Sequence, residues 1–289
     1  KAIEDLIAKT PQTLKDFRTG TGPRYNIVFP RYEYYAPPDH THVLPAQEKA
    51  PFIRNIGGEL IAVNRQGYFA SVYVGKPVTD PYYIAGREKY RVVRDGEENA
   101  GGVEKYQCTP MLGGGLTIFA TGAYGNAVLA ANWTPYTHHG IVAFVGNKRY
   151  WEDYFATEYK LDEGARTLIV TGKIETRPLT YKRTYVFDEA LTVTVALTAS
   201  EAVSHERIFE NIPVPVGPVK AKGAEIAVDG TEEGANGFTV KNADGSGIAV
   251  RLKNPQRIAI SRNGLKKGDL QFARVEILLP QTIEKGATI

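Results

Sequence analysis

The sequence predicts a mostly β protein, a large antiparallel β-sandwich with one short helix at the N-terminus. Five strand-like runs follow one another between residues 158 and 214, and short turn sequences separate them. One of these runs, 191–199, alternates apolar residues with threonine and alanine. Period-two alternation indicates a strand with one buried face. Short connections favour antiparallel neighbours, because a parallel return needs about a dozen residues or more.

The five runs are 158–161, 167–173, 179–187, 191–199 and 205–214. Further strands are predicted at 59–64, 67–75, 116–121, 126–131 and 141–145, with another pair of strands within 82–93, and then at 224–228, 237–241, 247–252, 257–262 and 270–279. The triple glycine at 113–115 lacks the Lys-Ser/Thr of a phosphate-binding loop and predicts a turn or bulge where backbones approach closely.

Three segments organise the chain. Residues 1–24 predict a helix, with Ile3, Leu6 and Ile7 at helical spacing, followed by a Gly/Pro linker. Residues 25–218 predict the main antiparallel sandwich. Residues 219–289 follow a proline-rich stretch (213–218), interpreted as a stiff linker, and predict terminal strands of the same assembly or of a small second sandwich.

The amino-acid composition excludes several classes of protein and site. The 289 residues include 35 basic and 32 acidic ones, a balance too even to predict nucleic-acid binding. The single cysteine, Cys108, excludes an internal disulfide framework and a multi-cysteine metal site. No cofactor is expected. No apolar run reaches the roughly 18 residues of a membrane helix. The chain opens on Lys1 rather than Met, so we expect a piece whose N-terminal extension held a signal peptide or an upstream domain, in a secreted or periplasmic protein.

Histidines and aromatic residues gather in two irregular segments. His40 and His42 lie in the first, and His138 and His139 follow Trp133 in the second. Irregular loops on a rigid β scaffold are where binding and catalytic residues concentrate. The His40-Thr41-His42 pair has metal-ligand spacing, but nothing marks a third ligand, so a surface or hydrogen-bonded pair is favoured over a metal site. A third cluster, Glu152-Asp153 beside Trp151, suits sugar binding; the alternative is a solvated turn.

The segments 181–188, 191–195 and 207–213 together resemble a known family. An Arg-x-Tyr-x-Phe strand (Arg183, Tyr185, Phe187) precedes an apolar alternating strand. This order is similar to the β-supersandwich domains, of galactose-mutarotase-like fold, that follow an α/α-toroid in polysaccharide lyases and related glycan-active proteins. The resemblance covers residues 58–213. It implies a glycan-degrading protein whose acid/base residues come from both domains, with the N-terminal helix belonging to the toroid side.

Two functions stay open. One is a carbohydrate-related β domain of a polysaccharide lyase-like protein, and the other is a non-catalytic carbohydrate-binding or structural module of a larger secreted protein. The expected partner is a polysaccharide or oligosaccharide.

If the domain is catalytic, the two aromatic loops are expected to meet at one rim of the sheet. An eliminase needs a base, an acid and a group that stabilises the developing negative charge. The alternative is that these aromatic residues plug the edge of the sandwich. The predicted roles are base for His138 or His139, acid for Tyr136 or Tyr35, charge stabiliser for Arg31 or Asn132, and substrate contact for Trp133, Trp151, His40 and His42.

Overall fold

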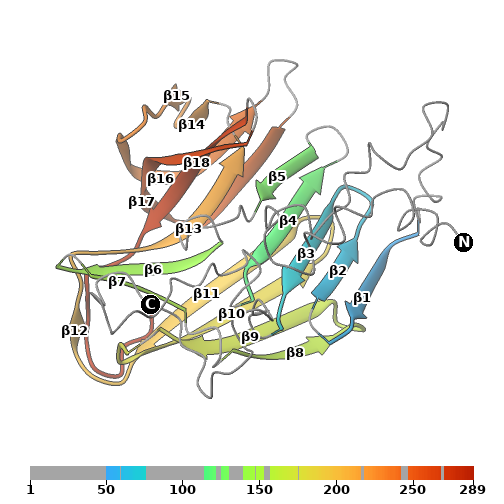
Figure 1. Ribbon diagram of the computed structural model, residues 1–289, viewed down its shortest axis with the longest axis horizontal. Helices are drawn as coiled ribbons and strands as arrows, with labels where there is room; N and C mark the ends of the chain where they lie inside the picture. Colours follow the sequence, from blue (N-terminus) through green and yellow to red (C-terminus); the bar gives the residue numbers. More distant parts are fainter. Residues whose placement is uncertain are drawn as a thin grey trace, which may run out of the picture. The chain divides into compact units, whose positions relative to one another are not determined.

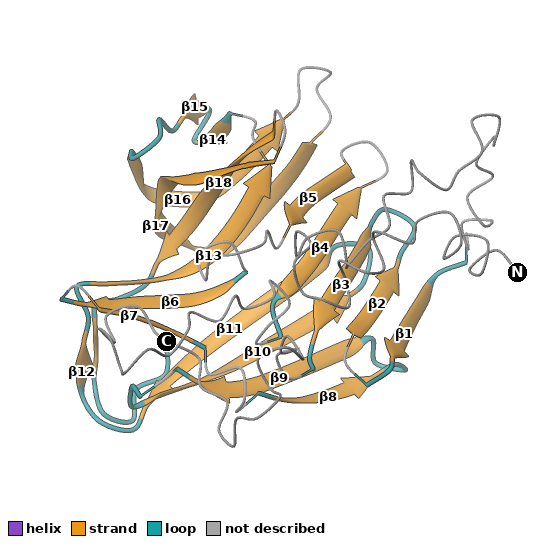
Figure 2. Cartoon of the chain, in the orientation of Figure 1, coloured by secondary structure: helices purple, strands orange, loops and turns teal. Residues whose placement is uncertain are grey.

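The computed structural model describes residues 50–58, 60–75, 114–121, 125–129, 139–146, 148–152, 157–174, 176–215, 218–241, 247–267 and 270–289, all within the unit Ala50–Ile289. Every regular element in these ranges is a β-strand (Figure 2). All the strand pairs are antiparallel, which confirms the mostly β, antiparallel prediction. The predicted helix within residues 1–24 and the predicted pair of strands within 82–93 lie outside the described residues.

The four-stranded sheet follows the predicted meander most closely. Its order is β11-β10-β9-β8. Three of its strands have the bounds that the sequence predicts, and the fourth is one residue longer. Turn residues between the runs therefore set the strand ends. The strands are β8 (Glu158–Asp162), β9 (Thr167–Lys173), β10 (Leu179–Phe187) and β11 (Leu191–Ala199).

A five-stranded sheet precedes it in the chain, in the order β1-β2-β3-β4-β5 (Figure 1). The backbone N–H of Arg65 donates to the carbonyl of Tyr68 and closes the turn between β2 and β3. The strands are β1 (Phe52–Ile56), β2 (Leu60–Asn64), β3 (Phe69–Tyr73), β4 (Leu116–Thr121) and β5 (Gly125–Leu129).

The largest sheet has eight strands in the order β15-β14-β16-β17-β18-β13-β6-β7. Strands β12 (Val203–Ser204) and β19 (Thr282–Ile283) form a separate pair. Apart from β19, the described strands after residue 218 thus hydrogen-bond into the same sheet as β13. The eight strands are β6 (Gly140–Val145), β7 (Lys148–Trp151), β13 (Arg207–Pro215), β14 (Val219–Ala221), β15 (Ala224–Glu225), β16 (Thr231–Lys241), β17 (Gly247–Lys267) and β18 (Leu270–Leu278).

Two details of this sheet correct the sequence interpretation. Pro213 and Pro215, read as part of a linker, lie in β13, which pairs with β18 as far as Pro215. The two strands predicted at 247–252 and 257–262 are one long strand, β17. Its pairing with β16 shifts register between Ala235 and Gly237, so a bulge within β17 takes the place of the break between the two predicted strands.

The three large sheets contribute to one hydrophobic core. Its members include Ile61 of β2, Tyr185 of β10 and Ile212 of β13. Two hydrogen bonds also join the sheets. The hydroxyl of Tyr185 donates to the backbone carbonyl of Gly114 at 2.7 Å. The hydroxyl of Tyr68 donates to the backbone carbonyl of Asp188 at 3.2 Å. The first bond joins β10 to the segment just before β4, and the second joins the β2–β3 turn to the residue after β10. Among the described residues, no helix is long and apolar enough to cross a bilayer.

Candidate functional site

Most of the residues predicted to form the site lie outside the described part of the chain. These are Arg31, Tyr35, His40, His42, Asn132, Trp133, Tyr136 and His138, so the predicted meeting of the two aromatic loops stays a prediction. Of Trp151, the structure places only the backbone, which pairs with Val142 at the end of β7. His139, directly before β6, is described in full.

His139 is buried, with 4% of its surface exposed, and both ring nitrogens have polar neighbours. The backbone N–H of Leu116 donates to Nδ1 at 3.1 Å, and Nε2 lies 3.2 Å from a carboxylate oxygen of Glu210. Because Nδ1 accepts a hydrogen bond, the ring proton belongs on Nε2, where it donates to Glu210. In this arrangement His139 links β4 to β13.

A buried ionic cluster lies next to this histidine. Arg183 projects from β10 and is fully buried. Its Nη2 donates to Oε1 of Glu152 at 2.8 Å, and to the two carboxylate oxygens of Glu210 at 2.9 and 3.1 Å. We call Arg183, Glu152, Glu210 and His139 the buried network. Together they tie β10 to β13 and to the end of β7.

The local sequence explains why these charges face inward. On β10, Leu179, Tyr181, Arg183, Tyr185 and Phe187 alternate onto the buried face. Ile208, Glu210 and Ile212 alternate onto the core-facing side of β13 in the same way.

Glu152 reaches the cluster from a bridge that pairs its backbone with Ile174. Its Oε1 also accepts the N–H of Ile141 at 3.0 Å. A Cβ added at Gly140 would lie 3.1 Å from both carboxylate oxygens of Glu152, so glycine leaves room for this carboxylate. Glu152 is fully buried, which corrects the alternative that it belongs to a solvated turn.

Burial and mutual charge set the protonation of the network. Burial raises the pKa of Glu210 to about 7; Arg183 opposes this rise and Glu152 adds to it. Burial alone would lower the pKa of Arg183, but the charges of Glu152 and Glu210 more than offset it, so that its pKa lies well above the ordinary value. Burial raises the pKa of Tyr181 and of Tyr185 as well. The guanidinium of Arg183 thus neutralises and hydrogen-bonds the carboxyl groups of both Glu152 and Glu210.

We expect Glu210 to make the protein less stable as the pH rises from about 5 to 7. A carboxyl whose pKa is raised from 4.5 to about 7 binds its proton more tightly in the folded state. Its contribution is therefore fully present below the unfolded pKa and is lost as the pH rises through the folded one. Urea unfolding of the wild type and of Glu210→Gln at several pH values between about 5 and 7 measures this contribution to the free energy of unfolding.

The difference between the two proteins removes the contributions of other groups. One such group is His205, whose pKa is lowered by burial and by Arg177. We expect the wild type to lose stability with rising pH relative to Glu210→Gln. Parallel curves for the two proteins would contradict the raised pKa of Glu210.

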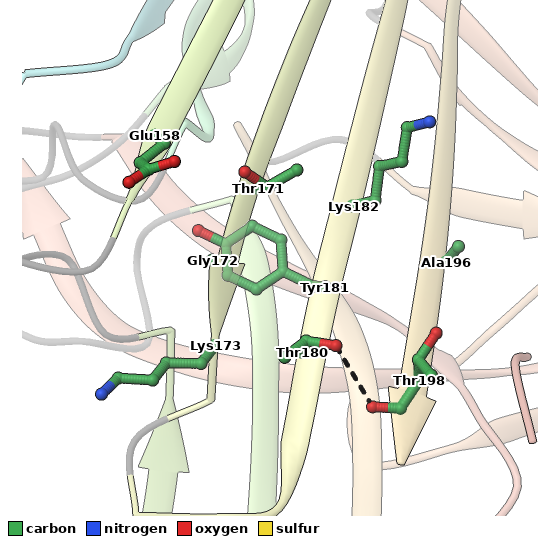
Figure 3. A pocket seen from close by; sticks show the side chains of 9 residues that line it. All are labelled: Glu158, Thr171, Gly172, Lys173, Thr180, Tyr181, Lys182, Ala196 and Thr198. Atoms are coloured by element: carbon green, nitrogen blue, oxygen red, sulfur yellow. Dashed lines mark hydrogen bonds between the residues drawn. The ribbon is translucent and has the colours of Figure 1, made fainter. Parts of the chain in front are cut away.

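An open groove of about 420 Å³ lies over β8, β9, β10 and β11, on the face of this sheet that points away from the core. This volume falls in the range of roughly 300–1,000 Å³ that small-molecule sites occupy. Figure 3 shows Glu158 and Lys182 on either side of Thr171, with Lys173 nearer the other end. The residues that line the groove are Glu158, Thr171, Gly172, Lys173, Thr180, Tyr181, Lys182, Ala196 and Thr198.

The residues that line the groove are paired with one another across neighbouring strands. Lys182 of β10 pairs with Thr171 on one side and with Ala196 on the other. One row further along, Thr180 pairs with Lys173 and Thr198. The ring of Tyr181 crosses Gly172 on the opposite, buried face, because a Cβ at Gly172 would lie 2.6 Å from the Tyr181 hydroxyl. The exposed face of the groove is therefore formed by threonine and lysine side chains together with Glu158 and Ala196.

Neither the buried network nor the groove was predicted from the sequence, although the strand patterns contain a signal for each. Arg183 and Glu210 occupy apolar-face positions in alternating strands. The threonines and lysines of the groove occupy the opposite face of the meander. In the described part of the chain, no three His, Cys, Asp or Glu side chains come together as metal ligands.

No family model and no curated protein matches this sequence. Its fold is similar to that of a solved structure, the 4-alpha-glucanotransferase from Thermococcus litoralis, with a TM-score of 0.50 and 10% sequence identity. The match covers 83% of this chain and 38% of the glucanotransferase chain. The likeness concerns the β fold and a minor part of the larger protein.

Proposed function

We propose that this chain is the carbohydrate-related β domain of a glycan-degrading, polysaccharide lyase-like protein and that it binds glycan in the groove over β8–β11. The observation that carries the proposal is the groove itself, a solvent-open surface whose hydroxyl and charged side chains stand in register. Sugars are recognised through many hydroxyl groups, and threonine hydroxyls both donate and accept hydrogen bonds.

The likeness to a protein named as a glucanotransferase supports a carbohydrate-related role. Because this chain matches 38% of that protein, the likeness also fits a domain that works beside a larger catalytic part. A supersandwich arrangement of the sheets, an upstream domain, and a secreted or periplasmic location belong to this proposal. The buried network has a structural role in it, since Glu152 and Arg183 are fully buried.

We expect the groove to account for glycan binding. Thr180→Trp would place a bulky side chain in the groove, at an exposed strand position that tolerates aromatic residues. Thr192→Trp, exposed on β11 outside the groove, is the matched control. In a screen of neutral and anionic polysaccharides by isothermal titration calorimetry, Thr180→Trp should weaken binding at least about tenfold, the change produced by roughly 1.4 kcal/mol. Thr192→Trp should bind like the wild type.

Absorbance of unsaturated sugar products, read in the same screen, tests the lyase-like activity separately. Product formation that persists in Thr180→Trp would place the chemistry away from the groove. If the wild-type protein binds none of the glycans, the carbohydrate-related role is contradicted and a structural module is favoured.

A further inference from the structure

The two edge strands of the four-stranded sheet differ in charge. β8 forms one edge (Figure 1), and the side chains that alternate onto its exposed face are Glu158, Lys160 and Asp162. Charged residues on an edge strand hinder the pairing of a further strand. β11 forms the other edge, and residues 190–199 carry no charge. Of the two edges, β11 alone lacks this protection.

The C-terminal segment covers one half of the β11 edge. The backbone N–H of Leu197 donates to the carbonyl of Ile289, and the N–H of Ile289 donates back to the carbonyl of Leu197, both at 2.9 Å. Because the backbone groups of alternate residues point to the same side of a strand, those of Leu191, Val193 and Val195 point to this edge as well. In the described part of the chain, no strand pairs with these three residues on that side.

The exposure of the side chains follows the same division. Leu197, beside the C-terminal segment, is 1% exposed. Leu191, Val193 and Val195 pack against the hydrophobic core but are only half-buried. A run of β-branched residues without charge or proline is typical of a segment that adds to another strand. A strand laid along residues 191–195 would remove this apolar surface from water and provide partners for the backbone groups of the edge.

The same strand of a second copy is complementary to this edge. In an antiparallel pair related by a two-fold axis at Val193, this residue faces its own copy and Leu191 faces Val195. Both copies then contribute the same outward-pointing backbone groups, as a two-fold contact requires. On the exposed surface, Thr192 faces Thr194 of the second copy, and threonine pairs stabilise neighbouring strands. No like charges meet across the axis.

The length of the uncovered edge also fits a second copy. Ile289 occupies the position opposite Leu197. In the two-fold register, Ala190 of the second copy faces Ala196, one position before it. Residues 188–190 connect β10 to β11, so the chain of the second copy turns away from the shared edge at this point. Residues 191–195 of both copies therefore pair without displacing the C-terminal segment.

We infer that this chain forms a dimer through the uncovered half of the β11 edge, with residues 191–195 of the two copies paired antiparallel about a two-fold axis. The pairing joins the two four-stranded sheets into one continuous sheet. It does not depend on glycan binding. Because these short segments pair over a small area compared with the roughly 1,200 Å² of the smallest standard interfaces, the dimer is weak and reversible.

Charge exchange at two exposed threonines tests the register. In sedimentation equilibrium over a range of concentrations, the wild type should dimerise. Thr192→Lys/Thr194→Lys should raise the dissociation constant of the dimer at least about tenfold, because each lysine faces a like charge across the axis. Thr192→Glu/Thr194→Glu should do the same, and an equal mixture of the two variants should dimerise again. Thr231→Lys/Asn236→Lys adds the same two charges at exposed positions of β16 and should dimerise like the wild type.

Amide hydrogen exchange locates the contact. The N–H groups of Val193 and Val195 should exchange more slowly as the protein concentration rises, whereas that of Thr194, which points to β10, should not change. A wild type that stays monomeric would overturn the inference. So would protection of Val193 and Val195 that does not depend on concentration, because another part of the same chain would then cover the edge.

The mixture of charged variants gives the last decision. The substituted threonines are exposed, so unchanged thermal unfolding of each variant is the check on folding. Folded variants that stay monomeric when mixed would contradict the two-fold register. Glycan binding by a protein that never dimerises would overturn this inference and keep the proposed function, and dimerisation without glycan binding would do the reverse.

Discussion

Replacing Arg183 by methionine should lower the free energy of unfolding by about 3–5 kcal/mol, the usual cost of breaking a buried ion pair. The guanidinium is fully buried and serves the carboxylates of both Glu152 and Glu210. Methionine fills much of the same volume but leaves two carboxylates in the core without their cation. Urea unfolding of the variant measures the loss.

The matched control is Arg166→Met. Arg166 pairs with Asp188 at 3.2 Å, but 48% and 62% of the two side chains are exposed. Exposed pairs contribute roughly 0–1 kcal/mol, so this variant should be nearly as stable as the wild type. Similar losses in the two variants would contradict the importance of burial.

A triple variant identifies the cause of the loss. Adding Glu152→Gln and Glu210→Gln to Arg183→Met removes both negative charges, and replacing a whole buried ionic group is often close to neutral. The triple variant should therefore be more stable than Arg183→Met alone. If it is less stable, the lost hydrogen bonds of the network, rather than the unpaired carboxylates, determine the cost.

Local patterning predicted the four-stranded sheet almost residue by residue. Three of its strands begin and end as the sequence indicated, because turn residues bound each alternating run. The exposed threonines at 192, 194 and 198 and the inward leucine at 197 also follow the predicted alternation. Local sequence suffices where neighbouring strands are also consecutive in the chain.

Non-local pairing was beyond the reach of such patterns. Strand β13 lies between β18 and β6, which are far from it in sequence. The residue pattern of a strand does not indicate which distant strand it pairs with. An Asn-Pro pair, here at 254–255, is locally typical of a turn. In the structure these residues lie in β17, within the bulge opposite Ala235 and Gly237. Tertiary pairing overrides a local turn signal at this point.

The candidate sites show the same division. The alternation of β10 places Arg183 among apolar residues, which indicates a buried partner but does not identify Glu210, 27 positions away. The groove likewise needs the register that pairs Thr180 with Lys173, and a strand pattern alone does not supply it. His139 was identified from its loop, but its contacts with Leu116 and Glu210 depend on two distant strands.

Close packing of Gly114 against Val170 of β9 gives the second large effect. The sequence predicted a turn or bulge at the triple glycine, and Gly114 lies in a turn. The N–H of Gly114 donates to the carbonyl of Tyr73 at 3.0 Å, and its own carbonyl accepts the Tyr185 hydroxyl. Its φ is +70°, and an added Cβ would lie 2.4 Å from Cγ1 of Val170. Alanine at this position is therefore opposed by both backbone and packing.

Gly114→Ala should lower the free energy of unfolding by at least about 2 kcal/mol. A left-handed backbone costs a non-glycine residue about 1–2 kcal/mol, and overpacking a core adds about 1–3 kcal/mol. Gly57→Ala isolates the first effect, because Gly57 has a φ of +66° and no atom within 4 Å of an added Cβ. Its loss should be clearly smaller.

Val170→Ala isolates the second effect. Removing the valine methyl groups in the Gly114→Ala background removes the two shortest contacts, at 2.4 and 2.7 Å, and leaves only the Cβ of residue 170 at 2.9 Å. The double variant should therefore lose less stability than the sum of the two single variants. Additive losses, or equal losses for Gly57→Ala and Gly114→Ala, would show that β9 shifts to accept the new methyl group. In that case the glycine would be needed for its backbone conformation alone.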